Sequence, residues 1–306
     1  DIYMLLSPIV TYNSQWPEMT DSTNTGFMNV YSKPDLILDS AAKEAQKNYV
    51  KQLLNHTNRY TGRKIKDEPN IIFVEVSNEP AQMADKPEAM TDYINGMVDA
   101  IKSAGCDKLI FYNVSQDFKV ASIVATAKVD GGTYAWYPQG LTSYRTVKGN
   151  PLLCVDRYEQ LADPAMKGKS KIVYEFDSTQ RDGGLQVPAM VREFVRGGCQ
   201  FIAMFSYDML RTAPKNLGWD VQFTNMVYTP RKAVATMISA EIVRRWSPGE
   251  PNRYYPANNR FGDFRLSYEE DLALLNSGDM YYHSASVSDR LKGIAALRHI
   301  AGFGSS

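Results

Sequence analysis

The sequence is poor in several features that would identify other classes of protein. Its three cysteines, Cys106, Cys154 and Cys199, are widely spaced and odd in number, which gives neither a metal-binding pattern nor a disulfide framework. Cys106 and Cys199 each adjoin a glycine, and we predict that both are packed in the core. No apolar run approaches the length of a membrane span. The 34 basic and 34 acidic residues cancel, which argues against a nucleic-acid partner or a polybasic membrane surface.

Residues that catalyse other kinds of hydrolysis are also scarce. The three histidines, His56, His283 and His299, are scattered, and none has a partner at metal-ligand spacing. We therefore predict no metal and no cofactor. The chain has no G-x-S-x-G sequence, which argues against a Ser-His-Asp hydrolase.

What the sequence does contain is an alternation of apolar runs with two different periods. Period-2 or continuous apolar runs predict strands, and runs with helical spacing predict helices. Strands are predicted at residues 2–9, 70–79, 108–114, 131–138, 171–177 and 201–209. Helices are predicted at residues 40–54, 87–105, 120–127, 187–197 and 229–243. Strands that alternate with helices favour a parallel sheet, and alternation alone does not separate a barrel from a doubly wound sheet.

Each predicted helix has an apolar face. The helix from residue 87 starts with Pro87 and can close at Gly105. The last helix opens with Thr229 as its cap and Pro230 as its first residue. The faces that we predict to be buried are Ala42, Ala45, Tyr49, Val50, Leu53 and Leu54; Met90, Ile94, Met97, Val98 and Ile101; Val187, Met190, Val191, Phe194 and Val195; and Ala233, Val234, Met237, Ile238 and Val243.

Two of the predicted strands end in a carboxylate. The apolar run at residues 71–76 is closed by Pro80, which cannot continue a ladder, so this strand ends at Asn78 and Glu79. A later strand carries Glu175 near its end. Ligands of α/β folds bind at the carboxyl ends of the strands, and two acids placed there can flank one glycosidic bond. A structural ion-pair role for the same acids is the alternative.

These two motifs resemble the strand-4 and strand-7 signatures of clan A glycoside hydrolases, of which family 5 is the best-known member. The resemblance covers residues 1–246 and implies a (β/α)₈ TIM barrel with retaining chemistry. It implies that Glu79 is the general acid/base and that Glu175 is the nucleophile. Asn78 matches the asparagine that holds the sugar 2-hydroxyl. In retaining enzymes the two carboxyl groups lie about 5–5.5 Å apart.

Further positions follow the resemblance or depart from it. Tyr137 matches a tyrosine that hydrogen-bonds the nucleophile in many such barrels, whereas Ala135 stands where those barrels often have histidine. Tyr207 ends the last strand where family 5 usually has tryptophan. Glu75 shares a strand face with Glu79, and we favour a buried structural carboxylate over a third catalytic acid. Asp177 either tunes the pair of glutamates or caps the loop.

Aromatic and amide side chains near the strand ends are candidates for sugar contact. Flat indole rings suit the C–H faces of sugars, although tryptophans are also common core residues and loop anchors. Trp246 ends a helix and is assigned to the core. The predicted substrate-binding residues are Asn78, Asn113, Tyr137, Trp136, Trp16, Tyr207 and Trp219.

The domain organisation is inferred from pattern changes. Six strands are too few for an eight-stranded barrel, so we expect residues 1–250 to form a barrel domain whose first two βα units lie upstream of Asp1. We expect the sheet edge beside residues 2–8 to be apolar and unpaired. After residue 250 the pattern changes to antiparallel strands around the turn at residues 276–279. We interpret residues 251–306 as the start of a β-sandwich-like domain, and we expect further domains in the same chain.

The sequence therefore predicts a retaining glycoside hydrolase that cleaves β-linked glucans, mannans or galactans with two glutamates. The alternative is a non-catalytic carbohydrate-binding or scaffold barrel. The expected partner is an oligo- or polysaccharide. The resemblance implies a secreted, periplasmic or cell-surface protein, because similar barrels joined to β-domains occur in large secreted glycan-degrading proteins.

Overall fold

The computed structural model describes residues 2–11, 26–115, 117–139, 148–176, 183–211, 224–248 and 253–305. The chain divides into two compact units. The first unit comprises Asp1–Tyr134 and Ala162–Ile172, and the second comprises Ala135–Leu161 and Val173–Ser306. None of the helices in the described ranges has the length and apolar character needed to cross a bilayer.

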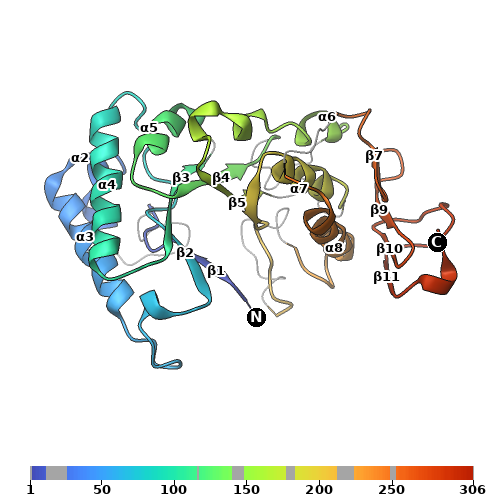
Figure 1. The fold of residues 1–306 in the computed structure, drawn as a ribbon, viewed down its shortest axis with the longest axis horizontal. Coiled ribbons are helices and arrows are strands. Elements are labelled where there is room, and N and C mark those ends of the chain that lie inside the picture. Colours follow the sequence, from blue (N-terminus) through green and yellow to red (C-terminus); the bar gives the residue numbers. More distant parts are fainter. Residues whose placement is uncertain are drawn as a thin grey trace. The chain divides into compact units, whose positions relative to one another are not determined.

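Within the described residues, six strands form one sheet in chain order (Figure 1). The β1–β2, β2–β3 and β3–β4 pairs are parallel, as the alternation of strands and helices predicts. The strands are β1 (Met4–Leu6), β2 (Ile71–Glu75), β3 (Leu109–Ser115), β4 (Gly131–Trp136), β5 (Ser170–Phe176) and β6 (Cys199–Ile202).

The first and last of these strands are shorter than predicted. Instead of continuing to residue 9, β1 stops at Leu6, and the next backbone bridge of this segment in the described residues joins Val10 to Asn78. Likewise, β6 ends at Ile202, and Tyr207 forms a single bridge with Thr224. Proline at position 8 lacks the N–H that a continuous ladder needs, which explains the break after β1.

The helices of the first unit are α1 (Phe27–Val30), α2 (Asp35–Leu38), α3 (Ser40–Asn55), α4 (Pro87–Ser103) and α5 (Ala121–Thr126), with 3₁₀ turns η1 (Ile65–Asp67), η2 (Phe118–Val120) and η4 (Pro164–Met166). Helices α3 and α4 lie side by side (Figure 1). The predicted apolar face of α4 is confirmed, because all five of its residues are buried. Its predicted ends are confirmed too, since Pro87 is its first residue and Gly105 follows it with φ of 78°.

The predicted face of α3 is partly wrong. Tyr49 is exposed, and a polar residue, Gln46, is buried in the stripe instead. The Gln46 amide donates to the Leu36 carbonyl at 2.7 Å, and its oxygen accepts from the Tyr93 hydroxyl at 2.9 Å. A glutamine whose amide is satisfied in this way can occupy a core position that hydrophobic periodicity assigns to another residue.

The second unit contains α6 (Leu152–Val155), α7 (Gln186–Arg196) and α8 (Pro230–Arg245), and the 3₁₀ turn η3 (Glu159–Ala162) lies at its border with the first unit. Helix α7 lies against α8 and is buried along almost its whole length (Figure 1). The predicted apolar face of α7 is confirmed, and so is its glycine stop, where Gly198 has φ of 82°. Because α7 is also enclosed on its polar side, Arg192 and Glu193 are buried charges.

Helix α8 corrects two predictions. Met237 and Val243 are exposed by 43% and 49%, and the buried stripe runs instead through Ala235, Ile238 and Ile242. This stripe keeps the i, i+3 and i+4 spacing but is rotated from the predicted face. Thr229 precedes the helix without capping it through its side chain. Its hydroxyl instead accepts from the Asn225 N–H at 2.8 Å, which closes the preceding turn.

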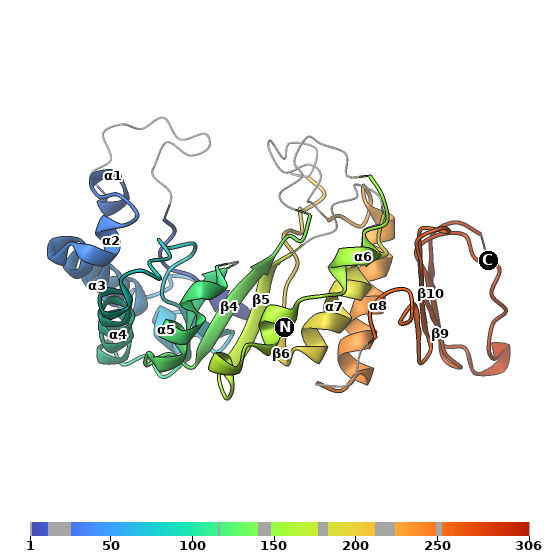
Figure 2. The same ribbon diagram turned by 90° about the horizontal axis from the view of Figure 1, so that it is seen from above.

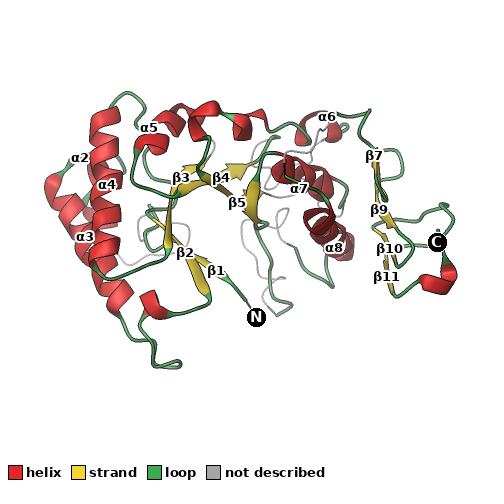
Figure 3. Cartoon of the chain, viewed as in Figure 1, coloured by secondary structure: helices red, strands yellow, loops and turns green. Residues whose placement is uncertain are grey.

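A second sheet of five strands follows in the described residues, in the order β11-β10-β9-β8-β7 (Figure 3). The antiparallel pairing of β9 with β10 around the predicted turn is confirmed, whereas the β10–β11 pair is parallel. Helix α8 lies against β9 and β10 (Figure 2). The domain boundary at residue 250 stays a prediction. The elements are β7 (Arg260–Phe261), β8 (Phe264–Ser267), β9 (Leu272–Asn276), β10 (Met280–His283), η6 (Ile294–Ala296) and β11 (His299–Gly302).

A buried polar cluster joins α7 to the segment that leads into the second sheet. The carboxylate of Asp156 is fully buried and accepts from the Tyr255 N–H and the Asn258 amide, both at 2.7 Å. The Arg192 guanidinium donates to the Asn258 carbonyl at 2.6 Å and stacks over the Phe261 ring at 4.1 Å. Burial lowers the pKa of Arg192 to about 10, an effect that the nearby carboxylates only partly oppose.

We expect Asp156→Ala to lower the free energy of unfolding by about 3 kcal/mol, because the buried Asn258 amide and the partly buried Tyr255 N–H then lose their acceptor. Urea denaturation followed by tryptophan fluorescence measures the change. Asp163→Ala is the matched control, since Asp163 also accepts a backbone N–H, from Ala165, but in an exposed turn. We expect Asp163→Ala to lower the free energy of unfolding by about 1 kcal/mol. Equal losses from the two variants contradict the assigned role of the buried cluster.

Candidate active site

Glu79 stands just beyond the end of β2, in the first unit. Backbone hydrogen bonds carry the strand past its last ladder residue, from the Val76 N–H to Phe111 and from the Asn78 N–H to Ile9. Glu79 itself has φ of 45°, a left-handed conformation that is uncommon for a residue other than glycine. Asn78 and Glu79 are both partly exposed, as residues that meet a ligand must be.

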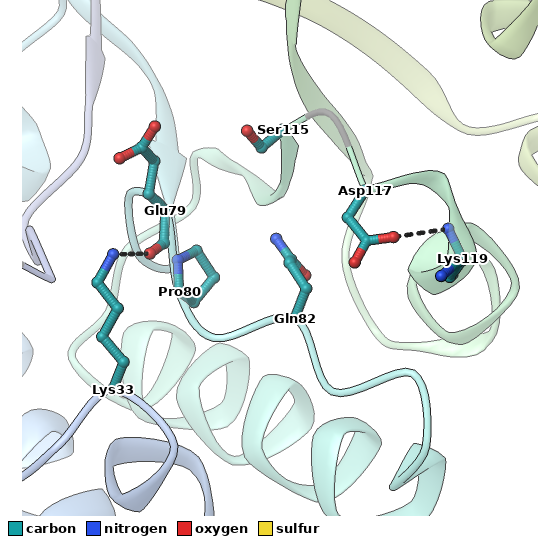
Figure 4. Close-up of a pocket in the computed structure, with 7 residues that line it drawn as sticks. All are labelled: Lys33, Glu79, Pro80, Gln82, Ser115, Asp117 and Lys119. Atoms are coloured by element: carbon teal, nitrogen blue, oxygen red, sulfur yellow. Dashed lines mark hydrogen bonds between the residues drawn. The ribbon is translucent and has the colours of Figure 1, made fainter.

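A pocket of about 500 Å³ lies beside Glu79 at the carboxyl ends of β2 and β3. Each side of it carries one acid and one lysine, with Lys33 and Glu79 facing Asp117 and Lys119 across Gln82 (Figure 4). Among the described residues, six of the seven that line it are polar or charged, and none is aromatic. Such a pocket suits a hydroxyl-rich ligand that is held by hydrogen bonds. Its lining residues are Lys33, Glu79, Pro80, Gln82, Ser115, Asp117 and Lys119.

Two features of β3 shape the wall of this pocket. The register with β4 shifts between Asn113 and Ser115, and Ser115 has φ of 53°. The Gln82 amide donates to the Asn113 carbonyl at 2.7 Å, which ties the chain after Pro80 to β3. Left-handed residues other than glycine gather where a site constrains the backbone, and Glu79 and Ser115 both line this one pocket.

Glu75 lies below the strand ends, as a fully buried carboxylate. It accepts from the Ser7 hydroxyl at 2.6 Å, from the Asn113 amide at 3.1 Å and from the Thr133 hydroxyl. The predicted role of Glu75 as a buried, hydrogen-bonded structural carboxylate is thereby confirmed. Asn113 is itself buried in this cluster, and its contact with a substrate stays a prediction.

Glu175 is on β5 in the second unit and is partly exposed. The Tyr137 hydroxyl, just past the end of β4, donates to Glu175 Oε2 at 3.4 Å. The hydrogen bond that the resemblance predicts between this tyrosine and this glutamate is therefore present. A phenol that donates to a carboxylate stabilises its ionised form, which is the form that a nucleophile needs.

Trp136 is packed into the second unit. Its ring stacks on Tyr158 with centroids 4.4 Å apart and meets the edge of Phe194 at 5.7 Å. The Tyr158 hydroxyl donates to the Ala135 carbonyl at 3.1 Å, so this stack also holds the end of β4. Trp136 is only 8% exposed, and its contact with a sugar stays a prediction.

The remaining predicted residues are placed as follows. Tyr207 is 61% exposed beyond the end of β6, where a sugar can reach its ring. Asn78 is partly exposed beside Glu79. Trp16, Trp219 and Asp177 lie outside the described residues. The structure thus gathers Asn78, Glu79 and the pocket in the first unit, and it gathers Tyr137 and Glu175 in the second.

The sequence did not indicate the polar residues that support Glu75 and Glu79. Ser7 and Thr133 serve Glu75, and Thr11 and Lys33 serve Glu79. The available signal was weak: Thr133 is a hydroxyl residue inside an otherwise apolar strand. In the part of the chain that the structure describes, no group of three or more acidic, histidine or cysteine residues is placed to hold a metal ion.

Comparison with known protein families places the first part of the chain. Residues 5–129 match the model described as GH family 5 β-mannosidase-like. The mannan endo-1,4-β-mannosidase 3 of Arabidopsis thaliana is 36% identical over 88 residues, which cover 28% of this chain and 21% of that protein. The putative mannan endo-1,4-β-mannosidase 4 of the same plant is 35% identical over 82 residues. The match to the first of these relatives thus spans about a fifth of that relative's length.

Solved structures establish the fold. The endo-β-1,4-mannanase of Thermotoga petrophila aligns with a TM-score of 0.61 and 17% identity, covering 91% of this chain and 63% of that one. The endo-1,4-β-mannanase of Rhizomucor miehei aligns with a TM-score of 0.55 and 18% identity, covering 78% and 72%. These alignments confirm the predicted TIM-barrel class. The match of residues 5–129 confirms the resemblance to family 5.

Proposed function

We propose that this chain, a clan A protein of the family 5 type, is a retaining glycoside hydrolase that cleaves β-1,4-linked mannan. Glu79 serves as general acid/base and Glu175 as nucleophile. The observation that carries the proposal is the set of groups that surround the two strand-end glutamates. Glu79 borders a polar pocket, and Glu175 accepts a hydrogen bond from the tyrosine expected beside a nucleophile. The mannanase names of the relatives support mannan over the other β-glycans.

The reaction proceeds in two displacements. Glu175 attacks the anomeric carbon while Glu79 gives its proton to the departing glycosidic oxygen, which leaves a glycosyl-enzyme ester and a freed hydroxyl. Water then attacks the same carbon, Glu79 takes its proton, and the ester bond to Glu175 breaks. Two inversions give a sugar of retained configuration.

The residues around the pair have matching tasks. Tyr137 orients the Glu175 carboxylate for attack on the anomeric carbon through its hydrogen bond to Oε2. Asn78 precedes Glu79 and is partly exposed, as a residue that holds the 2-hydroxyl of the reacting sugar must be. The pocket beside Glu79 offers lysine, amide and hydroxyl groups to the hydroxyls of a neighbouring sugar unit.

The test is hydrolysis of purified β-mannan, β-glucan and β-galactan, followed by proton NMR of the first anomer released. We expect mannan to be cleaved fastest and the β-anomer to appear first. Faster cleavage of glucan or galactan contradicts the substrate, and the α-anomer contradicts retention. A folded chain that binds mannan without cleaving it favours the second candidate, a non-catalytic carbohydrate-binding barrel.

A further inference from the structure

The backbone at Glu79 is held in a conformation that the residue does not favour by itself. Its φ of 45° is left-handed, where a side chain crowds its own peptide group. The next residue is Pro80, whose ring further restricts the backbone of the residue before it. A conformation of this kind persists only where neighbouring groups determine it.

The groups that determine it meet at the Glu79 carbonyl. The buried Thr11 hydroxyl lies 2.5 Å from this oxygen and 3.0 Å from the carbonyl oxygen of Asn78. From the opposite segment, the Lys33 ammonium donates to the same Glu79 oxygen at 3.2 Å (Figure 4). One carbonyl has two lone pairs, and both are engaged here. The lysine bond is charge-assisted and stronger than a neutral one.

These bonds act on the direction of the Glu79 side chain. The Glu79 carbonyl belongs to the peptide plane that links Glu79 to Pro80, and Pro80 is itself buried. Thr11 and Lys33 hold this plane at its oxygen, and Thr11 also holds the preceding plane at the Asn78 oxygen, so the Cα–Cβ direction of Glu79 between the two planes is fixed as well. The pairing of β1 with β2 does not depend on them, because Leu5, Leu6 and the Asn78 N–H pair with the neighbouring strand through backbone groups.

We propose that Thr11 and Lys33 are positioning residues that aim the carboxyl group of Glu79 at the departing oxygen. This inference rests on the proposed acid/base role of Glu79. Neither residue has to touch the sugar that reacts. A shift of about 1 Å in a catalytic group can cost 10²-fold in rate, so a clamp on one carbonyl oxygen has a measurable effect on catalysis.

The test compares two substrates with different needs for an acid. A manno-oligosaccharide needs its leaving oxygen protonated, whereas dinitrophenyl β-mannoside has a leaving group that departs without help. We expect T11V and K33M to lower kcat/KM on the oligosaccharide by about 10- to 100-fold and to change it on the dinitrophenyl substrate by less than about threefold. T11S and K33R keep a donor and restore most of the loss.

Matched controls come from the same unit. The Thr126 hydroxyl donates to the Ile123 carbonyl at 3.0 Å, and the Lys66 ammonium donates to the Ala104 carbonyl at 2.6 Å, both away from the pocket. T126V and K66M should leave the ratio of the two kcat/KM values unchanged. Equal losses on both substrates in T11V and K33M mean a general structural role and overturn the proposal. So does a failure of T11S and K33R to recover activity.

A crystal structure of the T11V/K33M double variant of the full chain separates this inference from the proposed function. We expect the Glu79 backbone to leave its left-handed conformation and the carboxyl group to move. A carboxyl that stays in place overturns the positioning role, whatever the activity. If the wild-type chain cleaves neither substrate, the proposed function fails, while a displaced carboxyl in the double variant still supports the clamp.

Discussion

Glu175→Ala is expected to lower kcat on dinitrophenyl β-mannoside by on the order of 10⁴-fold or more, because it removes the atom that forms the covalent intermediate. Sodium azide should restore part of the rate. Alanine leaves a space on one face of the sugar, and the small anion enters it and attacks the anomeric carbon once. A single displacement inverts the configuration, so the product is an α-mannosyl azide.

The rate with and without azide is measured by release of dinitrophenolate, and the anomeric configuration by NMR. Glu159→Ala is the matched control, since Glu159 lies on an exposed 3₁₀ turn and bonds only to Tyr254 among the described residues. It should keep the wild-type rate. A β-azide from the Glu175 variant means that the roles of Glu79 and Glu175 are reversed. An unchanged rate places the nucleophile elsewhere.

Glu79→Ala should behave differently on the two kinds of substrate. Loss of the general acid lowers kcat/KM on manno-oligosaccharides by about 10²- to 10⁴-fold, because their leaving oxygen is a poor leaving group without a proton. Dinitrophenyl β-mannoside still forms the glycosyl-enzyme, which then accumulates because no base activates water. Azide attacks this intermediate and gives the β-azide by a second inversion.

Three measurements check this second result: the burst of dinitrophenolate, the mass of the trapped glycosyl-enzyme, and the configuration of the azide product. Glu88→Ala, in the exposed first turn of α4, is the control and should show no burst. Absence of a covalent intermediate in Glu79→Ala, together with equal losses on both substrates, rules out Glu79 as the acid/base. The clamp variants at Thr11 and Lys33 should resemble a milder form of Glu79→Ala.

The parts of the fold that depend on local pattern could be predicted from the sequence. The apolar run before Asn78, the stripe of α4 and the stop at Gly198 all follow from nearest-neighbour chemistry along one element. The prediction of a buried helix face was wrong in two places. In α3 a hydrogen-bonded polar residue, Gln46, occupies a core position. In α8 tertiary packing buries a stripe that is rotated from the predicted one.

In the candidate site, too, some residues could be predicted from local pattern and others could not. Glu79 and Glu175 could be proposed as site residues because periodicity locates the two strands and, for Glu79, Pro80 marks the strand end. Thr11 was not, because its contact with Glu79 depends on how a residue beyond β1 lines up with the end of β2, which is a register between distant segments. For Trp136 the sequence left sugar contact and loop anchoring open, and its stacking on Tyr158 and Phe194 depends on tertiary packing that the sequence does not show.

The buried cluster around Asp156 limits how this protein can be recombined. Tyr255 and Asn258 come before the first strand of the second sheet, yet their donors satisfy a carboxylate that belongs to the packing of α7. A gene junction placed at residue 250 takes the residue at position 258 from the other parent, and a side chain without an amide there leaves the buried Asp156 carboxylate short of one donor. We therefore expect an exchange of the second sheet between related genes to cost less stability when residues 253–261 stay with the helices. By this criterion residues 253–261 belong with α7 in any such exchange.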